Sequence, residues 1–169
     1  MNEHIRLTKA CMDSLQSQIL EAADICLEAA RKRNTIFLFG NGGSAADASH
    51  IAAEFTGRYV MDRRGLPAIC LNADPSALTS ISNDFGYDQV FARQLDALAR
   101  KGDVCIGITT SGKSPNVTIA LEKAKLMGCR TIGLAGKEGG EIPSLCDISI
   151  IVPSQITSRI QEIHILIGH

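Results

Sequence analysis

The 169-residue chain contains no tryptophan, and aromatic residues make up only 4% of it. Proteins that stack nucleic-acid bases or sugar rings do so on aromatic side chains, so neither kind of platform is expected here. A basic surplus is missing as well, because 17 lysines and arginines face 18 aspartates and glutamates, for a net charge of −1. Affinity for nucleic acid depends on neutralising phosphates with positive charge. The composition therefore predicts no nucleic-acid partner.

Long apolar runs are also absent. No stretch reaches the ~18 apolar residues of a membrane-spanning helix, and residues 1–16, MNEHIRLTKACMDSLQ, lack the apolar core of a signal peptide. The six cysteines form no C-x-x-C pair, so we expect reduced thiols, buried as small apolar groups, and neither disulfides nor a zinc–thiolate site. These absences predict a soluble, cytoplasmic protein with no membrane partner.

Short apolar runs alternate with helical patterns along the chain. Apolar residues recur at steps of three and four over residues 12–30, without glycine or proline, which predicts a long first helix. Strands are predicted at 35–39, 67–71, 104–108, 130–135 and 148–152, and helices at 45–56, 75–100 (in two pieces) and 115–127. Apolar strands separated by helices are typical of a parallel sheet covered on both sides. The predicted fold is a Rossmann-like, doubly wound α/β domain with an extra N-terminal helix.

The length predicts a single domain over residues 1–169, with the N-terminal helix at about 4–32 and the α/β core at about 34–169. Two polar loops follow predicted strands in this core, at 40–44 and 109–114. Ligands of doubly wound folds bind beyond the carboxyl ends of the strands, so both loops should lie on one rim.

The second loop, TTSGKS, supplies four hydroxyl groups and a glycine immediately before Pro115. Pro115 fits the first position of a helix, and Ser114 fits its N-cap. Free N–H groups at a helix start favour an anion, so we interpret this loop as a phosphate site. In the first loop, we expect Gly42 and Gly43 to allow close backbone approach to a ligand, while Asn41 and Ser44 bond to its oxygens.

Both loops match nucleotide-binding patterns, and we reject both matches. Residues 107–114, GITTSGKS, satisfy the P-loop consensus G-x-x-x-x-G-K-[ST], but Gly107 lies within a predicted strand and no apolar run ending in aspartate offers a second magnesium ligand. Residues 40–45 fit the dinucleotide fingerprint G-x-G-x-x-A, but the only candidate ribose-binding acid, Asp62, precedes the second strand instead of ending it.

His50 and Glu54 are one turn apart on the predicted helix 45–56. At this spacing they share a helix face and could chelate a metal, act as a base and its orienting group, or form an ordinary surface pair. Because their helix begins at the first loop, we expect the pair at the ligand rim. Gln161 and His169 are further candidates, but lie about 12 Å apart along a helix. They reach one metal only if the side chains lean together, the helix bends or different subunits supply them. We expect His164 to be a core or interface histidine.

Four segments together resemble the sedoheptulose-7-phosphate isomerases, or phosphoheptose isomerases, of the sugar-isomerase (SIS) domain family. They are FGNGGSAADASHIAAEFTGRY (39–59), SNDFGYDQVFARQ (82–94), GITTSGKSPNV (107–117) and RIQEIHILIGH (159–169). The resemblance covers nearly the whole chain and implies the SIS α/β fold. It implies conversion of sedoheptulose 7-phosphate to D-glycero-D-manno-heptose 7-phosphate, the first step of ADP- or GDP-heptose synthesis for lipopolysaccharide core or surface polysaccharide. It also implies a homotetramer with active sites between subunits.

The resemblance further implies roles for individual residues. One zinc ion per subunit would be bound by His50, Glu54, Gln161 and His169, and Glu54 and His169 would be the catalytic acid/base pair. Together with the first loop, it gives the predicted substrate-binding residues: Asn41, Gly42, Gly43, Ser44, Glu54, Asn83, Asp84, Thr109, Thr110, Ser111, Ser114 and Gln161. Because a zinc-bound glutamate or histidine is a poorer proton acceptor, the ligand and base roles compete, and which proton each residue takes stays open.

The chain departs from the family pattern at two places. Lys113 stands where relatives more often carry asparagine, and the chain ends at His169 where relatives continue their last helix, so we expect that helix to be truncated. Two other functions are considered. One is a non-catalytic SIS protein that binds a replication initiator or senses a sugar phosphate, which the presence of both acid/base residues disfavours. The other is an isomerase of pentose or hexose phosphates, which only the size of the pocket would distinguish.

Overall fold

The computed structural model describes the whole chain, from Met1 to His169. Five parallel strands form one sheet in the order β2-β1-β3-β4-β5. They are β1 (Ile36–Gly40), β2 (Ala68–Cys70), β3 (Val104–Thr109), β4 (Arg130–Gly136) and β5 (Ile148–Val152). Every residue of β1 and β3 is buried, as expected for strands covered on both faces. The strand order reverses at β1, which creates a crevice beyond the carboxyl ends of β1 and β3.

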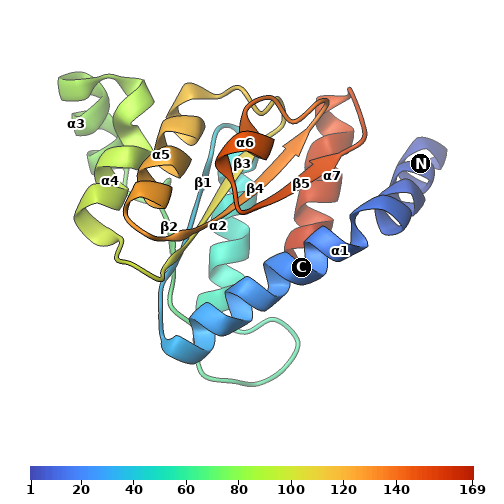
Figure 1. Cartoon of the computed structure of the whole chain (residues 1–169), viewed down its shortest axis with the longest axis horizontal. Helices are drawn as coiled ribbons and strands as arrows, with labels where there is room; N and C mark the ends of the chain where they lie inside the picture. Colours follow the sequence, from blue (N-terminus) through green and yellow to red (C-terminus); the bar gives the residue numbers. More distant parts are fainter.

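Helices cover both faces of the sheet (Figure 1). One layer consists of α1 (Asn2–Lys32), α2 (Gly43–Thr56) and α7 (Thr157–Gly168), and the other of α3 (Pro75–Phe85), the 3-10 turn η1 (Tyr87–Gln89), α4 (Val90–Leu98), α5 (Pro115–Leu126) and α6 (Ile142–Leu145). Alternate residues of β1 serve the two layers, since Ile36 and Leu38 belong to the core beneath α1, whereas Phe37 and Phe39 belong to the core beneath α4 and α5. The predicted doubly wound fold with an extra N-terminal helix is confirmed.

Most predicted elements are present, including the break within residues 75–100, and two details differ. Helix α2 begins at Gly43, two residues before the predicted start. The predicted break within residues 75–100 falls at Gly86, whose φ of 89° ends α3, and the turn η1 follows it. Helix α6 was not predicted, because four residues are too few to show a helical period.

The structure describes the state of the cysteine side chains and the length and hydropathy of the helices. All six cysteines are free; Cys11, Cys70, Cys105 and Cys129 are buried, and the other two are partly exposed. No helix in the structure combines the length and the hydropathy that crossing a bilayer requires.

His164 of α7 is fully buried, which confirms its prediction as a core histidine. Its Nε2 donates a hydrogen bond to the carbonyl oxygen of Ala135 in β4, at 3.0 Å, and its buried Nδ1 has no partner. Burial lowers the pKa of the His164 imidazole, with the Ala135 hydrogen bond acting in the opposite direction. The neutral His164 imidazole therefore connects α7 to β4 through this hydrogen bond.

This arrangement predicts a specific loss of stability in acid. The unfolded chain binds a proton at His164 below about pH 6.5, whereas the folded protein resists that proton, so the free energy of unfolding should fall as the pH drops through this value. The variant His164→Gln can still donate to Ala135 but does not titrate. Urea denaturation between pH 7.5 and pH 5 should show a shallower pH dependence for the variant. Identical slopes for the two proteins would contradict this role.

Candidate active site

The two polar loops lie side by side at the carboxyl edge of the sheet. Strands β1 and β3 pair in parallel with Gly40 opposite Ile108, so each strand delivers its loop at the same level. Gly40 itself has no room for a side chain, because an added Cβ would come within 2.7 Å of the Ile108 carbonyl oxygen. Gly42, with a φ of 57°, then turns the chain into α2. The prediction of a shared rim is confirmed.

Side-chain amides hold the first loop in place. Asn72, just beyond β2, accepts from the Gly40 N–H at 3.2 Å and donates to the Gly40 carbonyl oxygen at 2.9 Å. The Asn41 side chain bonds to Asn116 and Tyr87. Ser44 is buried under the loop. The sequence analysis did not identify Asn72, Asn116 or Tyr87, although Tyr87 and Asn116 fall inside the segments quoted for the resemblance.

The second loop is organised differently from the predicted cap. Ser114 occupies the N-cap position of α5, but its side chain makes no capping hydrogen bond and lies 3.0 Å from the hydroxyl of buried Thr109. Ser114 is confirmed at the N-cap position, but the capping hydrogen bond expected there is absent, because its hydroxyl pairs with that of Thr109. Ser111 Oγ accepts from the Lys113 N–H at 3.2 Å. The first turn of α5 is left without a side-chain cap, which suits an anion.

A third segment carries Asn83 and Asp84, the last polar residues of α3. Both are exposed, and the Asn83 amide donates to the Asp84 carboxylate at 2.8 Å. Three residues later, the Tyr87 hydroxyl reaches Asn41 of the first loop. The segments 41–44, 83–84 and 109–114, which the sequence analysis assigned to substrate binding, are therefore arranged around the same carboxyl edge.

His50, Glu54 and His169 form a cluster with one nitrogen or oxygen from each lying within 4.8 Å of the others. His50 Nε2 is 3.4 Å from Glu54 Oε1 and 3.4 Å from His169 Nε2. A single chain brings these three residues together, because α7 packs against α2 and Gly168 lies directly against Ile51. The cluster is not at the loop itself: His50 lies seven residues after Gly43, about 10 Å along α2. The expected position of the pair at the loop rim is corrected accordingly.

Gln161 lies at the other end of the α2–α7 contact. Its side-chain amide packs directly against Gly43, where an added Cβ would overlap it. Gln161 is therefore beside the first loop, two turns of α2 before His50. Its position suits the predicted contact with substrate, and its predicted role as a metal ligand stays a prediction.

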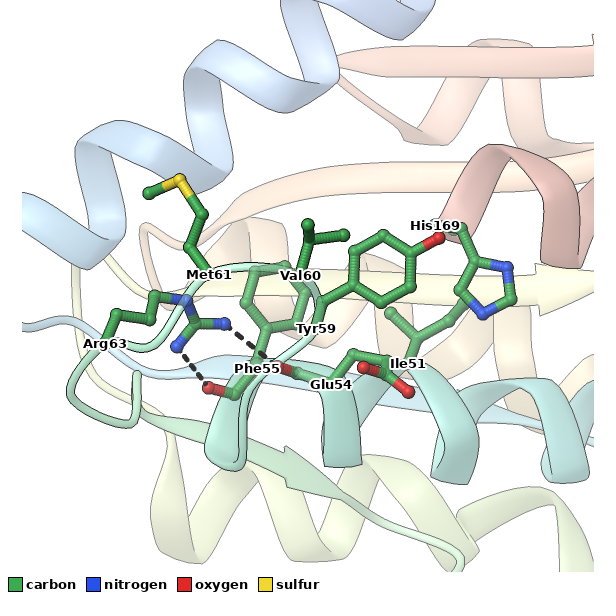
Figure 2. Close-up of a pocket in the computed structure, with 9 residues that line it drawn as sticks. Ile51, Glu54, Phe55, Tyr59, Val60, Met61, Arg63 and His169 are labelled. Atoms are coloured by element: carbon green, nitrogen blue, oxygen red, sulfur yellow. Dashed lines mark hydrogen bonds between the residues drawn. The ribbon is translucent and has the colours of Figure 1, made fainter.

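The segment after α2 covers the histidine cluster (Figure 2). The Tyr59 ring stacks on the His169 ring with centroids 5.2 Å apart and an interplanar angle of 8°, while His50 meets His169 edge-on. Arg63 donates from its guanidinium to the carbonyl oxygens of Glu54 and Phe55, at 2.9 and 3.0 Å. These residues enclose an open pocket of about 300 Å³ lined by Ile51, Glu54, Phe55, Tyr59, Val60, Met61, Arg63, Gly168 and His169.

Asp47 is one turn before His50 on α2. Burial raises the pKa of its carboxyl group, and the nearby His50 acts in the opposite direction. One carboxylate oxygen of Asp47 is buried without any hydrogen-bond partner. This unpartnered oxygen, one turn from His50, is an acceptor that a cation or a proton donor beside the cluster would satisfy.

The fold and the site define the class of protein. The SIS domain family matches residues 1–136 of the chain. A phosphoheptose isomerase of Nitratiruptor sp. is 57% identical over 167 residues, which are 99% of this chain and 89% of that protein. The solved phosphoheptose isomerase of Neisseria gonorrhoeae is 43% identical with a TM-score of 0.94, and that of Francisella tularensis is 33% identical with a TM-score of 0.96; each alignment covers 99% of this chain and 90% of the other. The chain belongs to the phosphoheptose isomerase family of SIS-domain proteins.

The contact between Gly43 and Gln161 can be tested directly. In Gly43→Ala the new methyl group must displace the Gln161 amide, a flexible side chain, so the free energy of unfolding should change by less than about 1 kcal/mol. The side-chain amide resonances of Gln161 in a ¹⁵N correlation spectrum should nevertheless shift, because the group leaves its position. The added substitution Gln161→Ala should remove any destabilisation. Unchanged Gln161 resonances in Gly43→Ala would show that the amide does not lie against Gly43.

Proposed function

We propose that the protein is a sedoheptulose-7-phosphate isomerase, which converts this ketose to D-glycero-D-manno-heptose 7-phosphate through an enediol(ate). The observation that carries the proposal is the His50–Glu54–His169 cluster, whose helix α2 starts at the first loop, beside the hydroxyl-rich second loop. Phosphoheptose isomerase is also the name of relatives about half identical over nearly the whole chain. We place the product in heptose activation for lipopolysaccharide core or surface polysaccharide.

In this proposal the phosphate group binds at the second loop. Thr109, Thr110, Ser111 and Ser114 supply hydroxyl groups, and the uncapped first turn of α5 adds N–H groups and the positive end of its dipole. Gly42, Gly43 and Ser44 of the first loop, together with Asn83, Asp84 and Gln161, would surround the sugar chain. Helix α2 starts at the first loop, beside the second, and His50 lies about 10 Å along it from Gly43, so the sugar chain would run from the phosphate site along α2. The reacting carbons, C1 and C2, would then lie at the cluster.

The reaction moves one proton between C1 and C2 and another between their oxygens. A base must take the carbon-bound proton, and a proton donor or positive charge must stabilise the developing oxyanion. Glu54 and His169 are the two groups we assign to these transfers. Arg63 fixes the backbone that carries Glu54, and Tyr59 fixes one face of the His169 ring. The backbone of Glu54 and the ring of His169 are therefore held in position before substrate arrives.

We also propose that His50, Glu54 and His169 hold zinc, with Gln161 as a fourth ligand once its side chain moves from Gly43 toward the cluster. Donor atoms about 2.0–2.1 Å from a tetrahedral ion lie roughly 3.4 Å apart, and both distances from His50 Nε2 within the cluster are 3.4 Å. When bound, zinc would polarise the sugar carbonyl and stabilise negative charge on its oxygen. A ligand of zinc is a weaker base, so the same Glu54 carboxylate could not serve both roles fully at one moment.

We propose that residues 1–169 form one domain, that it works as a homo-oligomer, specifically a tetramer, and that it is cytoplasmic. Exposed apolar side chains on α1, including Met12, Leu20 and Leu27, support contact with further copies. The pocket beside Glu54 is open and includes exposed Val60 and Met61, which a neighbouring subunit would cover. Six free thiols suit a reducing compartment.

The alternative function is a non-catalytic SIS protein that binds a replication initiator or senses a sugar phosphate. Such a protein needs the two loops to bind a sugar phosphate, but its function does not require Glu54, His50 and His169 to lie together. The cluster therefore favours the enzyme.

Replacement of Glu54 tests the proposed chemistry. In Glu54→Gln the side chain keeps its shape but accepts no proton, so isomerisation of sedoheptulose 7-phosphate should fall by at least about 10²-fold while the sugar phosphate still binds. Coupled assay of the aldose product and calorimetry of binding measure the two effects. Glu138→Gln, an exposed acid elsewhere, should behave as wild type. Near-normal turnover by Glu54→Gln would exclude Glu54 as the base.

Metal binding provides a second test. The wild-type chain should bind one zinc ion per subunit, and His50→Ala should weaken that binding by at least about tenfold, because it removes a ligand from the centre of the cluster. Competition with a chromophoric chelator measures the affinity. His4→Ala is the matched control, since His4 pairs with Glu162, in the middle of α7 and about 10 Å along the helix from His169. Equal zinc affinities for His50→Ala and wild type would contradict the proposed site.

A further inference from the structure

Three hydrogen bonds join the three segments that we assign to substrate binding. Asn41 lies in the first loop, Asn116 lies two residues after Ser114 of the second, and Tyr87 lies three residues after Asp84. The Asn41 and Asn116 amides face each other and bond reciprocally, with N···O distances of 2.8 and 2.9 Å. The Tyr87 hydroxyl donates to Asn41 Oδ1 at 3.0 Å. One side chain therefore connects all three segments.

The geometry limits what the Asn41 side chain can do for a ligand. Its carbonyl oxygen accepts from both Asn116 and Tyr87, which uses both of its lone pairs. One of its two amide hydrogens goes to Asn116 Oδ1, so a single N–H remains. The predicted direct bond from Asn41 to ligand oxygens can use only this N–H. The rest of its hydrogen-bonding capacity holds other parts of the protein.

Burial distinguishes the members of this network. Asn116 is 2% exposed, so its amide would be costly to bury if Asn41 did not satisfy it. Tyr87 is 55% exposed, and its ring contributes little to the core. The neighbouring Phe85 ring turns away to stack beneath the Arg93 guanidinium. The Tyr87 hydroxyl can therefore exchange its hydrogen bond to Asn41 for one to water. The buried amide of Asn116 has no such alternative to its pairing with Asn41.

We infer that Tyr87 and Asn116 are positioning residues, which act through Asn41 to hold the first loop, the 83–84 segment and the second loop at the spacing that a sugar phosphate requires. This inference rests on the proposed function for the identity of the ligand, and on the hydrogen bonds alone for the coupling between segments. Without the Tyr87 bond, the 83–84 segment and the first loop move independently. Binding of the sugar phosphate must then order them, which weakens binding and leaves the groups at the His50–Glu54–His169 cluster unchanged.

Tyr87→Phe isolates this role, because it removes one hydroxyl from an exposed ring and cannot unfold the core. We expect KM for sedoheptulose 7-phosphate to rise about threefold to tenfold, the effect of one hydrogen bond, with kcat and zinc affinity within twofold of wild type. Thr79→Val is the matched control: it removes an exposed hydroxyl that bonds only within α3. Asn116→Asp, which removes the donor to Asn41, should raise KM further. An unchanged KM in Tyr87→Phe, or a fall in kcat alone, would overturn the inference.

Two further measurements separate this inference from the proposed function. In calorimetry, Tyr87→Phe should bind sedoheptulose 7-phosphate more weakly than wild type, even if neither protein turns it over. Lack of turnover in both proteins would count against the isomerase function alone. Amide hydrogen exchange of the ligand-free proteins needs no substrate at all. Residues 41–44 should exchange faster in Tyr87→Phe than in wild type or Thr79→Val. Equal exchange rates at these residues would overturn the inference whatever the activity.

Discussion

Parallel pairing of β1 with β3 is the constraint on which the site depends. The register that places Gly40 opposite Ile108 brings two loops, distant in sequence, to the same edge and the same height. Gly40 has no space for a side chain between the strands, and Asn72 holds both of its backbone polar groups. Helices α2 and α5 start from these loops, so their directions follow from the same pairing. The second loop and helix α2 are thereby fixed relative to each other.

The contact between α2 and α7 completes the site. Small residues allow it: Gly43 lies against Gln161 at one end, and Gly168 lies against Ile51 at the other. The buried His164 fastens α7 to β4 between these ends. His169 consequently reaches the face of α2 that carries His50 and Glu54, and Tyr59 stacks on its outer side. The approach of His169 to His50 and Glu54 therefore depends on the packing of α7 against α2. The segment after α2 adds the stacked Tyr59 ring.

The sequence predicts the parts of this structure that depend on local pattern. Apolar periodicity located the five strands and the long helices, and the i, i+4 spacing paired His50 with Glu54. Local pattern does not predict contacts between side chains that are distant in the sequence. The Ser114 hydroxyl pairs with Thr109 instead of making a capping hydrogen bond on α5. Asn41 bonds to Asn116 and Tyr87, and the Tyr59 ring stacks on His169. None of these contacts follows from spacing along one element. Leaning side chains, a helix bend and different subunits were the three ways considered to unite Gln161 with His169, and His169 meets His50 without any of them, through helix packing.

In our proposal, these loops and this cluster together isomerise a seven-carbon sugar phosphate. Incubating the purified wild-type protein with sedoheptulose 7-phosphate, in parallel samples with added zinc and with a chelator, tests this directly when the sugar is followed by NMR. Anomeric signals of an aldose 7-phosphate should appear as the ketose signals decline. Absence of conversion in both samples, in a folded protein that still binds the sugar phosphate, would contradict the proposal and favour the sensor.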